Sequence, residues 1–277
     1  MAFSKLHFGI SAGILAVTAF FAPNLCAEPR PYQLSYEVYR NGKLAGQAEV
    51  DMQQKGEQWI IRSAGSGTRG LGRLLGVTDA EQVEGYFLDG RFRPEHFSHH
   101  SRLAGISDDW SAKFNWQDGT VAITKDDDVL SLDMGTGALD KLSLNVELQR
   151  RLREQVPDLQ FFQVSDDKIK PQTYRLLPRE QLETSLGCLN TVPVELVPTG
   201  STRFARSWHA PELDFLTVRL ERAKTNGVHL EMRISAMVLD GKRIDPVAPC
   251  SATHSGSSGP DGAAGRLLPM RRMRAPS

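Results

Sequence analysis

Three groups of residues have types and spacings that could perform chemistry. The first is Gly65, Gly67 and Gly70, a GxGxxG pattern that follows a strand-like segment. Such glycines let backbone amides approach a pyrophosphate at a helix N-terminus. Here Gly72 and Gly76 would interrupt that helix, and no alternation of strands and helices follows. The pattern therefore predicts a glycine-rich bend between strands and no nucleotide site.

The second group is a set of histidines that could ligate a metal: His96, His99 and His100, with His209 and His229 farther along the chain. On a β-strand, His96 and His100 share one face and His99 points to the other. At most two imidazoles therefore converge, whereas zinc sites usually have three or four protein ligands. We expect surface histidines and no metal.

The third group could support nucleophilic catalysis. Ser143, His209 and an aspartate could be combined into a triad, but a triad is defined by geometry that sequence does not show. The chain contains no GxSxG elbow, and Cys188 and Cys250 lack a local signature of an activated thiolate. The Asp126 to Asp128 run lacks the spaced oxygens of a calcium loop and predicts a solvated turn. We predict no catalytic residue and no cofactor.

The elements that must position these residues are mostly short alternating segments. Turn signals occur at Asn41-Gly42, Asp89-Gly90, Asp118-Gly119, Asn226-Gly227 and Asp240-Gly241. Asn or Asp before Gly favours the positive φ angles of a type I′ hairpin turn. Apolar residues alternate around these turns, which indicates strands with one buried face. The expected fold is mainly β, an antiparallel curved sheet or incomplete barrel.

One segment, at about residues 140–156, has helical periodicity. Asp140 suits the N-cap, and Pro157 would stop the helix. The apolar positions form a wide stripe: Leu142, Leu144, Val146, Leu148, Leu152 and Val156. The helix should pack on the sheet. A sheet curved around such a helix can be filled with side chains or can enclose a ligand cavity, and both alternatives remain open.

Composition changes at both ends of the chain. Residues 1–27 contain Lys5, an uncharged apolar stretch and Ala27 before Glu28, which predicts a cleavable signal peptide and a periplasmic protein. An uncleaved anchor and lipid attachment at Cys26 are the alternatives. Residues 28–245 should form a single β-rich domain. Residues 246–277, rich in Gly, Ser, Pro and Arg, predict a disordered tail that is dispensable for folding.

The chain after residue 27 has no apolar run of 18 residues, so we expect no transmembrane segment in it. Two cysteines remain, Cys188 and Cys250. An exported protein permits a disulfide, but so sparse a pair does not imply one, and its formation stays open. The 33 basic residues balance the 33 acidic ones, which argues against nucleic acid as a partner.

Several short motifs resemble a bacterial family known as domain of unknown function 3108. They are the Asp140 to Ser143 helix start, the LETSLGCLNTVPVEL stretch, Trp208-His209-Ala210-Pro211, the Arg219 to Glu221 strand with Asn226-Gly227 after it, and the Pro94 to Phe97 segment. The resemblance covers most of residues 30–238. It implies a secreted or periplasmic β-rich domain, and it supplies no activity, cofactor or catalytic residue.

Two functions follow as hypotheses. The first is a non-enzymatic cell-envelope protein that binds an apolar or amphipathic, lipid-like molecule or a partner protein between sheet and helix. Its expected ligand-facing residues are Leu144, Leu148, Leu152, Trp208 and His209. The second is a periplasmic hydrolase acting on envelope glycan or ester, with Trp208, His209 and carboxylates near a cleft. Convergent polar groups with perturbed ionisation would favour the enzyme, and an apolar cavity would favour binding.

Overall fold

The computed structural model describes residues 30–251, except 71, 72, 74, 75, 136, 199–203 and 224–226. The predicted signal peptide and residues 252–277 lie outside the described residues. The first half of the chain forms β1 (Tyr32–Arg40), β2 (Lys43–Lys55), β3 (Gln58–Gly67), β4 (Thr78–Leu88), β5 (Arg91–Leu103), β6 (Ile106–Asn115), β7 (Thr120–Lys125) and β8 (Asp128–Asp133).

The second half contains the helix and the remaining strands. They are β9 (Ala138–Leu139), α2 (Lys141–Arg153), β10 (Gln160–Val164), β11 (Ile169–Leu176), β12 (Glu180–Thr184), β13 (Gly187–Leu196), β14 (Phe204–Ala210), the 3₁₀ turn η1 (Pro211–Leu213), β15 (Leu216–Ala223), β16 (His229–Leu239) and β17 (Lys242–Arg243).

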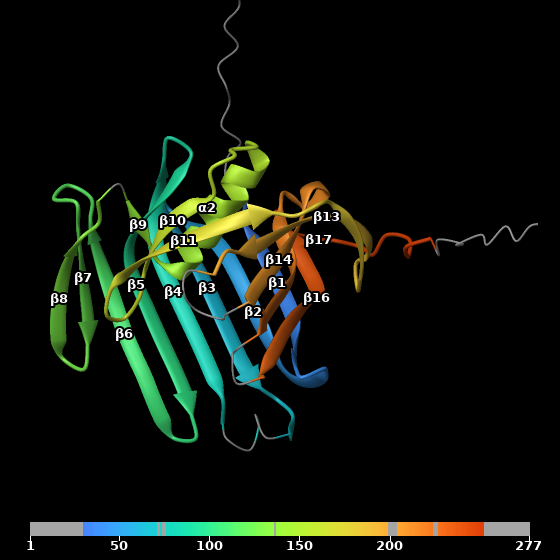
Figure 1. Ribbon diagram of the computed structural model, residues 1–277, viewed down its shortest axis with the longest axis horizontal. Coiled ribbons are helices and arrows are strands. Elements are labelled where there is room, and N and C mark those ends of the chain that lie inside the picture. Colours follow the sequence, from blue (N-terminus) through green and yellow to red (C-terminus); the bar gives the residue numbers. More distant parts are fainter. Residues whose placement is uncertain are drawn as a thin grey trace, which may run out of the picture.

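The strands form one strongly curved sheet that is not closed into a barrel. From β8, pairing runs in reverse chain order to β1, then passes to β16 and on through β15, β14 and β13 to β11, β10 and β9. Every pair is antiparallel except β9 with β10. The predicted mainly antiparallel, incompletely closed fold is therefore confirmed (Figure 1).

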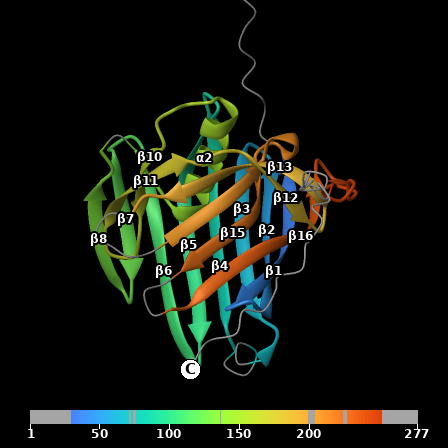
Figure 2. The same ribbon diagram turned by 45° about the vertical axis from the view of Figure 1, so that its right-hand side comes forward.

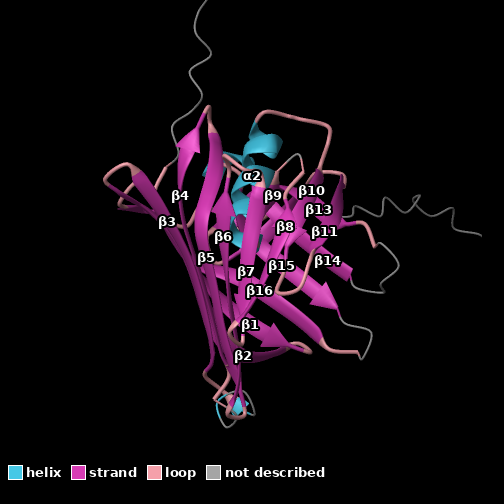
Figure 3. Ribbon diagram, turned by 90° about the vertical axis from the view of Figure 1, so that its left-hand side faces the viewer, coloured by secondary structure: helices cyan, strands magenta, loops and turns pink. Residues whose placement is uncertain are grey.

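The sheet folds into two leaves that cross each other. The long strands β2 to β6 form one leaf, and β13 to β16 pass in front of it (Figure 2). Seen from the side, the leaves diverge as a V from the β1–β2 region, with α2 between them in the opening (Figure 3). At the end of β7, Lys125 contacts Asp108 of β6 at 2.8 Å and Asp166, which follows β10, at 2.7 Å.

Local turn chemistry explains the hairpins. Asn41-Gly42, Asp89-Gly90 and Asp240-Gly241 all have positive φ at both residues, as a type I′ turn requires. Asp126 and Asp127 also have positive φ and join β7 to β8, so the acidic run is a turn. The glycine pattern lies at the end of β3, and its connection leads to the antiparallel strand β4. It is not part of a βαβ nucleotide fold.

The helix begins where predicted and ends earlier. Asp140 is the N-cap and accepts hydrogen bonds from the amides of Leu142 and Ser143. The last helical residue is Arg153, three positions before the expected end, and Gln155 has a positive φ of 55°. Buried residues lie on nearly every side of α2, including Glu147, which pairs with Arg150. Such a helix fills the interior of the sheet and does not lie on it as a surface layer.

Two apolar clusters make up the core. The larger includes Tyr32, Leu34, Ile61 and Phe97 and extends across the first leaf to the helix. The smaller contains Leu144, Leu148 and Leu152 of α2, packed on Leu159, Phe161, Val192 and Val194. No helix in the described part of the chain is long and apolar enough to cross a membrane.

Candidate functional site

The predicted ligand-facing leucines of α2 contact protein side chains. Leu144 and Leu148 are each 2% exposed and Leu152 is 6% exposed, and all three belong to the smaller core cluster. Because this part of the interior is filled, a ligand contact by these leucines stays a prediction that would require the helix to move.

Trp208 and His209 are neighbours on β14, but their side chains lie in different environments. The Trp208 indole donates to Glu180 Oε1 at 2.5 Å, and the guanidiniums of Arg206 and Arg219 lie over its ring. His209 is 2% exposed, and its Nδ1 lies 3.0 Å from the Phe215 carbonyl oxygen. A register shift separates the two residues in the ladder. They do not converge on one site.

His209 is a neutral imidazole. Burial lowers its pKa to about 4, against a smaller opposing effect of the hydrogen bond with Phe215. The proton on Nδ1 is donated to that carbonyl, so Nε2 is free to accept from Ser207 Oγ at 2.9 Å. Ser143 instead donates its hydroxyl to Asp140. The Ser143 and His209 combination considered from the sequence is therefore not a catalytic pair.

Along one row of paired residues, the inner face of the sheet changes from apolar to polar and charged side chains. On β16, β1 and β2 the row is apolar, with Met237, Leu34 and Val50 side by side. On β3, β4 and β5 the same row continues as Ser63, Glu81 and His99, and then reaches Trp110 on β6 and Lys125 on β7. The concave surface is thus apolar on one side and charged on the other.

The charged side meets the N-terminus of α2 in a group that we call the inner polar cluster: Asp79, Glu81, His99 and Lys141. Lys141 Nζ lies 2.8 Å from Glu81 Oε2, and His99 Nδ1 lies 3.3 Å from Glu81 Oε1. His99 Nδ1 is also 3.7 Å from Asp79 Oδ1. The side chain of Glu81 is 6% exposed and that of Asp79 is 53% exposed, so the cluster extends from the interior to solvent.

The charges of this cluster stabilise one another. Burial alone would raise the pKa of Glu81, but hydrogen bonds from His99 and Lys141 hold it at about 2. The hydrogen bond to Glu81 raises the pKa of His99 in turn, against the effect of burial. Next to the cluster, burial raises the pKa of the N-cap Asp140 to about 6, and its hydrogen bonds with Ser143 and Leu142 oppose that rise. Glu81 is consequently a fixed anion at neutral pH.

Sequence reasoning placed His96, His99 and His100 on the correct faces, but it missed the partners of His99 and was wrong to expect His209 at the surface. His99 lies on the inner face, while the neighbouring His96 and His100 lie on the outer face, as strand alternation predicts. The carboxylates that surround His99 come from the adjacent strand β4, about 20 residues away. Only the strand register brings these carboxylates close to His99, and no local sequence motif indicates the contact.

The outer face carries a shallow polar hollow of about 450 Å³ over β4 to β7. Its lining combines small hydroxyl and methyl groups with a few longer polar side chains: Gln82, Glu84, His96, Ser98, Ser111, Lys113, Ala122 and Thr124, with Phe97 and Ala112 beneath. A second hollow, of about 30 Å³, lies near the C-terminal end of α2. The expected ligand-facing residues line neither one.

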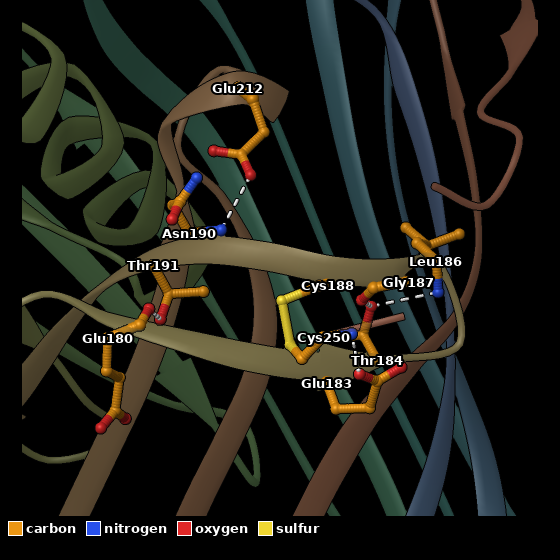
Figure 4. The surroundings of a disulfide bond; sticks show 10 residues. All are labelled: Glu180, Glu183, Thr184, Leu186, Gly187, Cys188, Asn190, Thr191, Glu212 and Cys250. Carbon is orange, nitrogen blue, oxygen red and sulfur yellow. Dashed lines mark hydrogen bonds between the residues drawn. A yellow bond between two sulfur atoms is a disulfide. The ribbon is translucent and has the colours of Figure 1, made fainter. Parts of the chain in front are cut away.

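A disulfide connects Cys188 of β13 with Cys250, which answers the question left open by the sequence (Figure 4). The segment before Cys250 pairs with the β12–β13 turn, because Val247 N donates to Leu186 O and Cys188 N donates to Ala248 O. Cys250 N donates to Glu183 Oε2 at 2.6 Å. Contacts with the β-rich domain therefore extend past residue 245, and they were not visible in the composition of residues 246–250.

Comparisons with known proteins find one family and solved structures of low sequence identity. The family described as "Protein of unknown function (DUF3108)" matches residues 35–234. A beta-barrel-like protein of the DUF1849 family from Brucella abortus is 11% identical, with 76% of this chain and 98% of that chain covered and a TM-score of 0.50. A proposed lipoprotein from Parabacteroides distasonis is 9% identical, with 76% and 96% covered and a TM-score of 0.34. No curated protein matches the sequence.

Proposed function

This chain belongs to the DUF3108 family of proteins of unknown function, and we propose that it is an exported, non-enzymatic protein of the cell envelope that binds an amphipathic molecule on the inner face of its sheet. The apolar part of the ligand lies against β16, β1 and β2. Its polar part points toward the inner polar cluster. A partner protein that inserts an amphipathic segment would meet the same surface.

The observation that carries this proposal is the incomplete covering of the amphipathic inner face. Val38 of β1, Leu220 of β15 and Met232 of β16 lie side by side on the inner face of the sheet, by strand register, and are only half-buried. Val38 and Met232 pack against the core at its margin. Apolar surface that the fold leaves half-covered, beside a charged cluster, suits a molecule with an apolar chain and a polar head.

The location rests on two independent features. The N-terminal 27 residues have the composition of a signal peptide. The Cys188–Cys250 disulfide is typical of an oxidising compartment such as the periplasm, because cytosolic thiols are kept reduced. Both features support export.

The test uses mature protein isolated from the periplasm. Native mass spectrometry should detect a bound amphiphile, and a fluorescent fatty acyl probe should bind the delipidated protein. Met232→Glu places a charge on the half-buried inner surface and should weaken probe binding at least about tenfold. Val129→Glu, on a side chain that is 69% exposed on edge strand β8, is the matched control and should leave binding unchanged. Equal effects of both variants, or no binding by the wild type, would refute the proposal.

One observation favours the hydrolase as a second candidate. Ser207 Oγ and His209 Nε2 lie 2.9 Å apart, and the Phe215 carbonyl orients the other ring nitrogen, which is the arrangement of a nucleophile with its base. The depressed pKa of His209, about 4, makes it a weak base at neutral pH. The structural role therefore fits better: Ser207 satisfies the second nitrogen of a buried ring.

An esterase assay separates the two candidates. We expect no hydrolysis of short-chain p-nitrophenyl esters above that given by Ser207→Ala protein. Turnover that Ser207→Ala abolishes, with the fold intact by circular dichroism, would establish the hydrolase.

A further inference from the structure

We infer that Asp79, Glu81 and His99 form a binding site for a first-row divalent cation of the zinc type. The three residues come from adjacent strands β4 and β5 and lie on the inner face beside the helix N-terminus. This inference does not rest on the amphipathic ligand proposed above, although the polar part of that ligand would point toward the same residues, because it is argued from the side chains of the inner polar cluster alone.

The donor atoms already have the separations that such a cation requires. His99 Nδ1 lies 3.3 Å from Glu81 Oε1 and 3.7 Å from Asp79 Oδ1, and one ligand atom from each residue falls within 4.8 Å of the other two. In a tetrahedral site with bonds of about 2.0 to 2.1 Å, the ligand atoms are about 3.4 Å apart. Only small side-chain movements separate the observed arrangement from coordination.

The chemistry of the donor set selects the ion. One imidazole with two carboxylates is a borderline-to-hard set, which suits Zn²⁺, Co²⁺ or Mn²⁺ better than the soft Cu⁺. Three protein ligands leave a fourth position for water or a ligand group. Asp79 is half-exposed, which provides the entry path.

Glu81 supplies a second observation, because its buried carboxylate is already paired with a cation. Oε1 accepts a hydrogen bond from Lys141 Nζ at 2.9 Å, and Oε2 accepts no hydrogen bond but lies 2.8 Å from the same ammonium, in an ion pair. Lys141 therefore acts as a stand-in cation for Glu81 and competes with a metal ion for it. Its side chain is 36% exposed, so it can turn toward solvent when a metal binds.

The strand itself offers a matched control. His100, the next residue, lies on the outer face with a single carboxylate, Asp109, at 3.3 Å. Both side chains are more than half exposed. One imidazole with one carboxylate offers only two ligands, so His100 should contribute nothing to metal binding.

The experiment is calorimetric titration of untagged mature protein with Zn²⁺. We expect one site per chain, weakened at least about tenfold by His99→Ala and by Glu81→Gln, and changed less than about twofold by His100→Ala. Lys141→Gln removes the competing ammonium and should strengthen binding. The ring of Trp110 lies 5.9 Å from that of His99, so Co²⁺ should quench a component of the tryptophan fluorescence that Trp110→Phe removes.

Circular dichroism of each variant establishes that it is folded. Quenching of tryptophan fluorescence by Co²⁺ in the Lys141→Gln protein is a second readout, in which none of the three metal-ligating side chains has been removed. Absence of Zn²⁺ binding to the wild type, or binding that His99→Ala leaves unchanged, would overturn the inference. In that case the cluster is an ion-pair network that only fixes α2 to the sheet.

Discussion

At the scale of single residues, the interior holds ionisable groups whose charge states are set by their partners. His209 and Glu81 are both buried, yet one is neutral and the other ionised at neutral pH. The difference is in the partner: His209 meets a carbonyl and a hydroxyl, whereas Glu81 meets a lysine and a histidine. A buried charge persists where an opposite charge or several hydrogen bonds stabilise it.

The neutral state of His209 predicts a loss of stability in mild acid. Its folded pKa of about 4 lies below the ordinary value of about 6.5, so the unfolded chain takes up the proton first as pH falls. The contribution is complete above about pH 6.5 and is lost progressively toward pH 4, by roughly 3 kcal/mol in all. Urea unfolding at pH 7.5 and pH 4.5 measures it.

His209→Gln is the comparison, because it removes this titration and leaves the other ionisable groups in place. The free energy of unfolding of the variant should change less between the two pH values than that of the wild type. The same pH dependence in both proteins would show that His209 is protonated in the native state.

At the scale of elements, α2 is a filling element for the sheet, and its leucines make a large contribution to stability. Leu148 is 2% exposed and packs in the cluster with Phe161 and Val194. Leu148→Ala should lower the free energy of unfolding by about 2 to 5 kcal/mol, since the surrounding strands cannot close the cavity. Leu103→Ala, at a side chain that is 53% exposed, should change it by less than about 0.5 kcal/mol. Similar losses from both would mean that α2 packs loosely.

The segment around Val247 crosses the β12–β13 turn and packs closely against Gly187. This residue has φ of +92°, and a Cβ there would lie 2.2 Å from the Val247 carbonyl oxygen. Gly187→Ala should therefore cost more than Gly105→Ala, where φ is +82° and no atom lies within 4 Å of the added Cβ. Thermal melting of the two variants isolates the crowding from the backbone strain. Equal losses would show that the segment does not cross Gly187 in solution.

At the scale of the whole molecule, features with a local cause were predictable from sequence. Type I′ turns follow from the pairs that begin at Asn41, Asp89 and Asp240, but not from Asp118-Gly119, where only the glycine has a positive φ. The start of α2 follows from Asp140. The filled interior, the His99 cluster and the disulfide depend on register between distant strands, which sequence periodicity does not fix. The Ser207 and His209 pair also escaped notice, because a Ser-x-His spacing is common and places both side chains on one face of any strand.

At the C-terminal end of the described chain, Val247, Ala248 and Cys250 contact the β12–β13 hairpin. Truncation after Asp245 should reduce stability, contrary to what composition alone indicated, because it removes Cys250 and the backbone pairing of Val247 with the β12–β13 turn. The disulfide spans 62 positions of sequence, and loss of such a link costs about 2 to 4 kcal/mol. Truncation after Ser251 retains every one of these contacts and is the matched control, so its thermal midpoint should stay within a few degrees of the full chain. Cys250→Ser in the full chain separates the covalent link from the pairing. If truncation after Asp245 leaves the midpoint unchanged, the segment contributes nothing to the fold, and the domain ends where its composition changes.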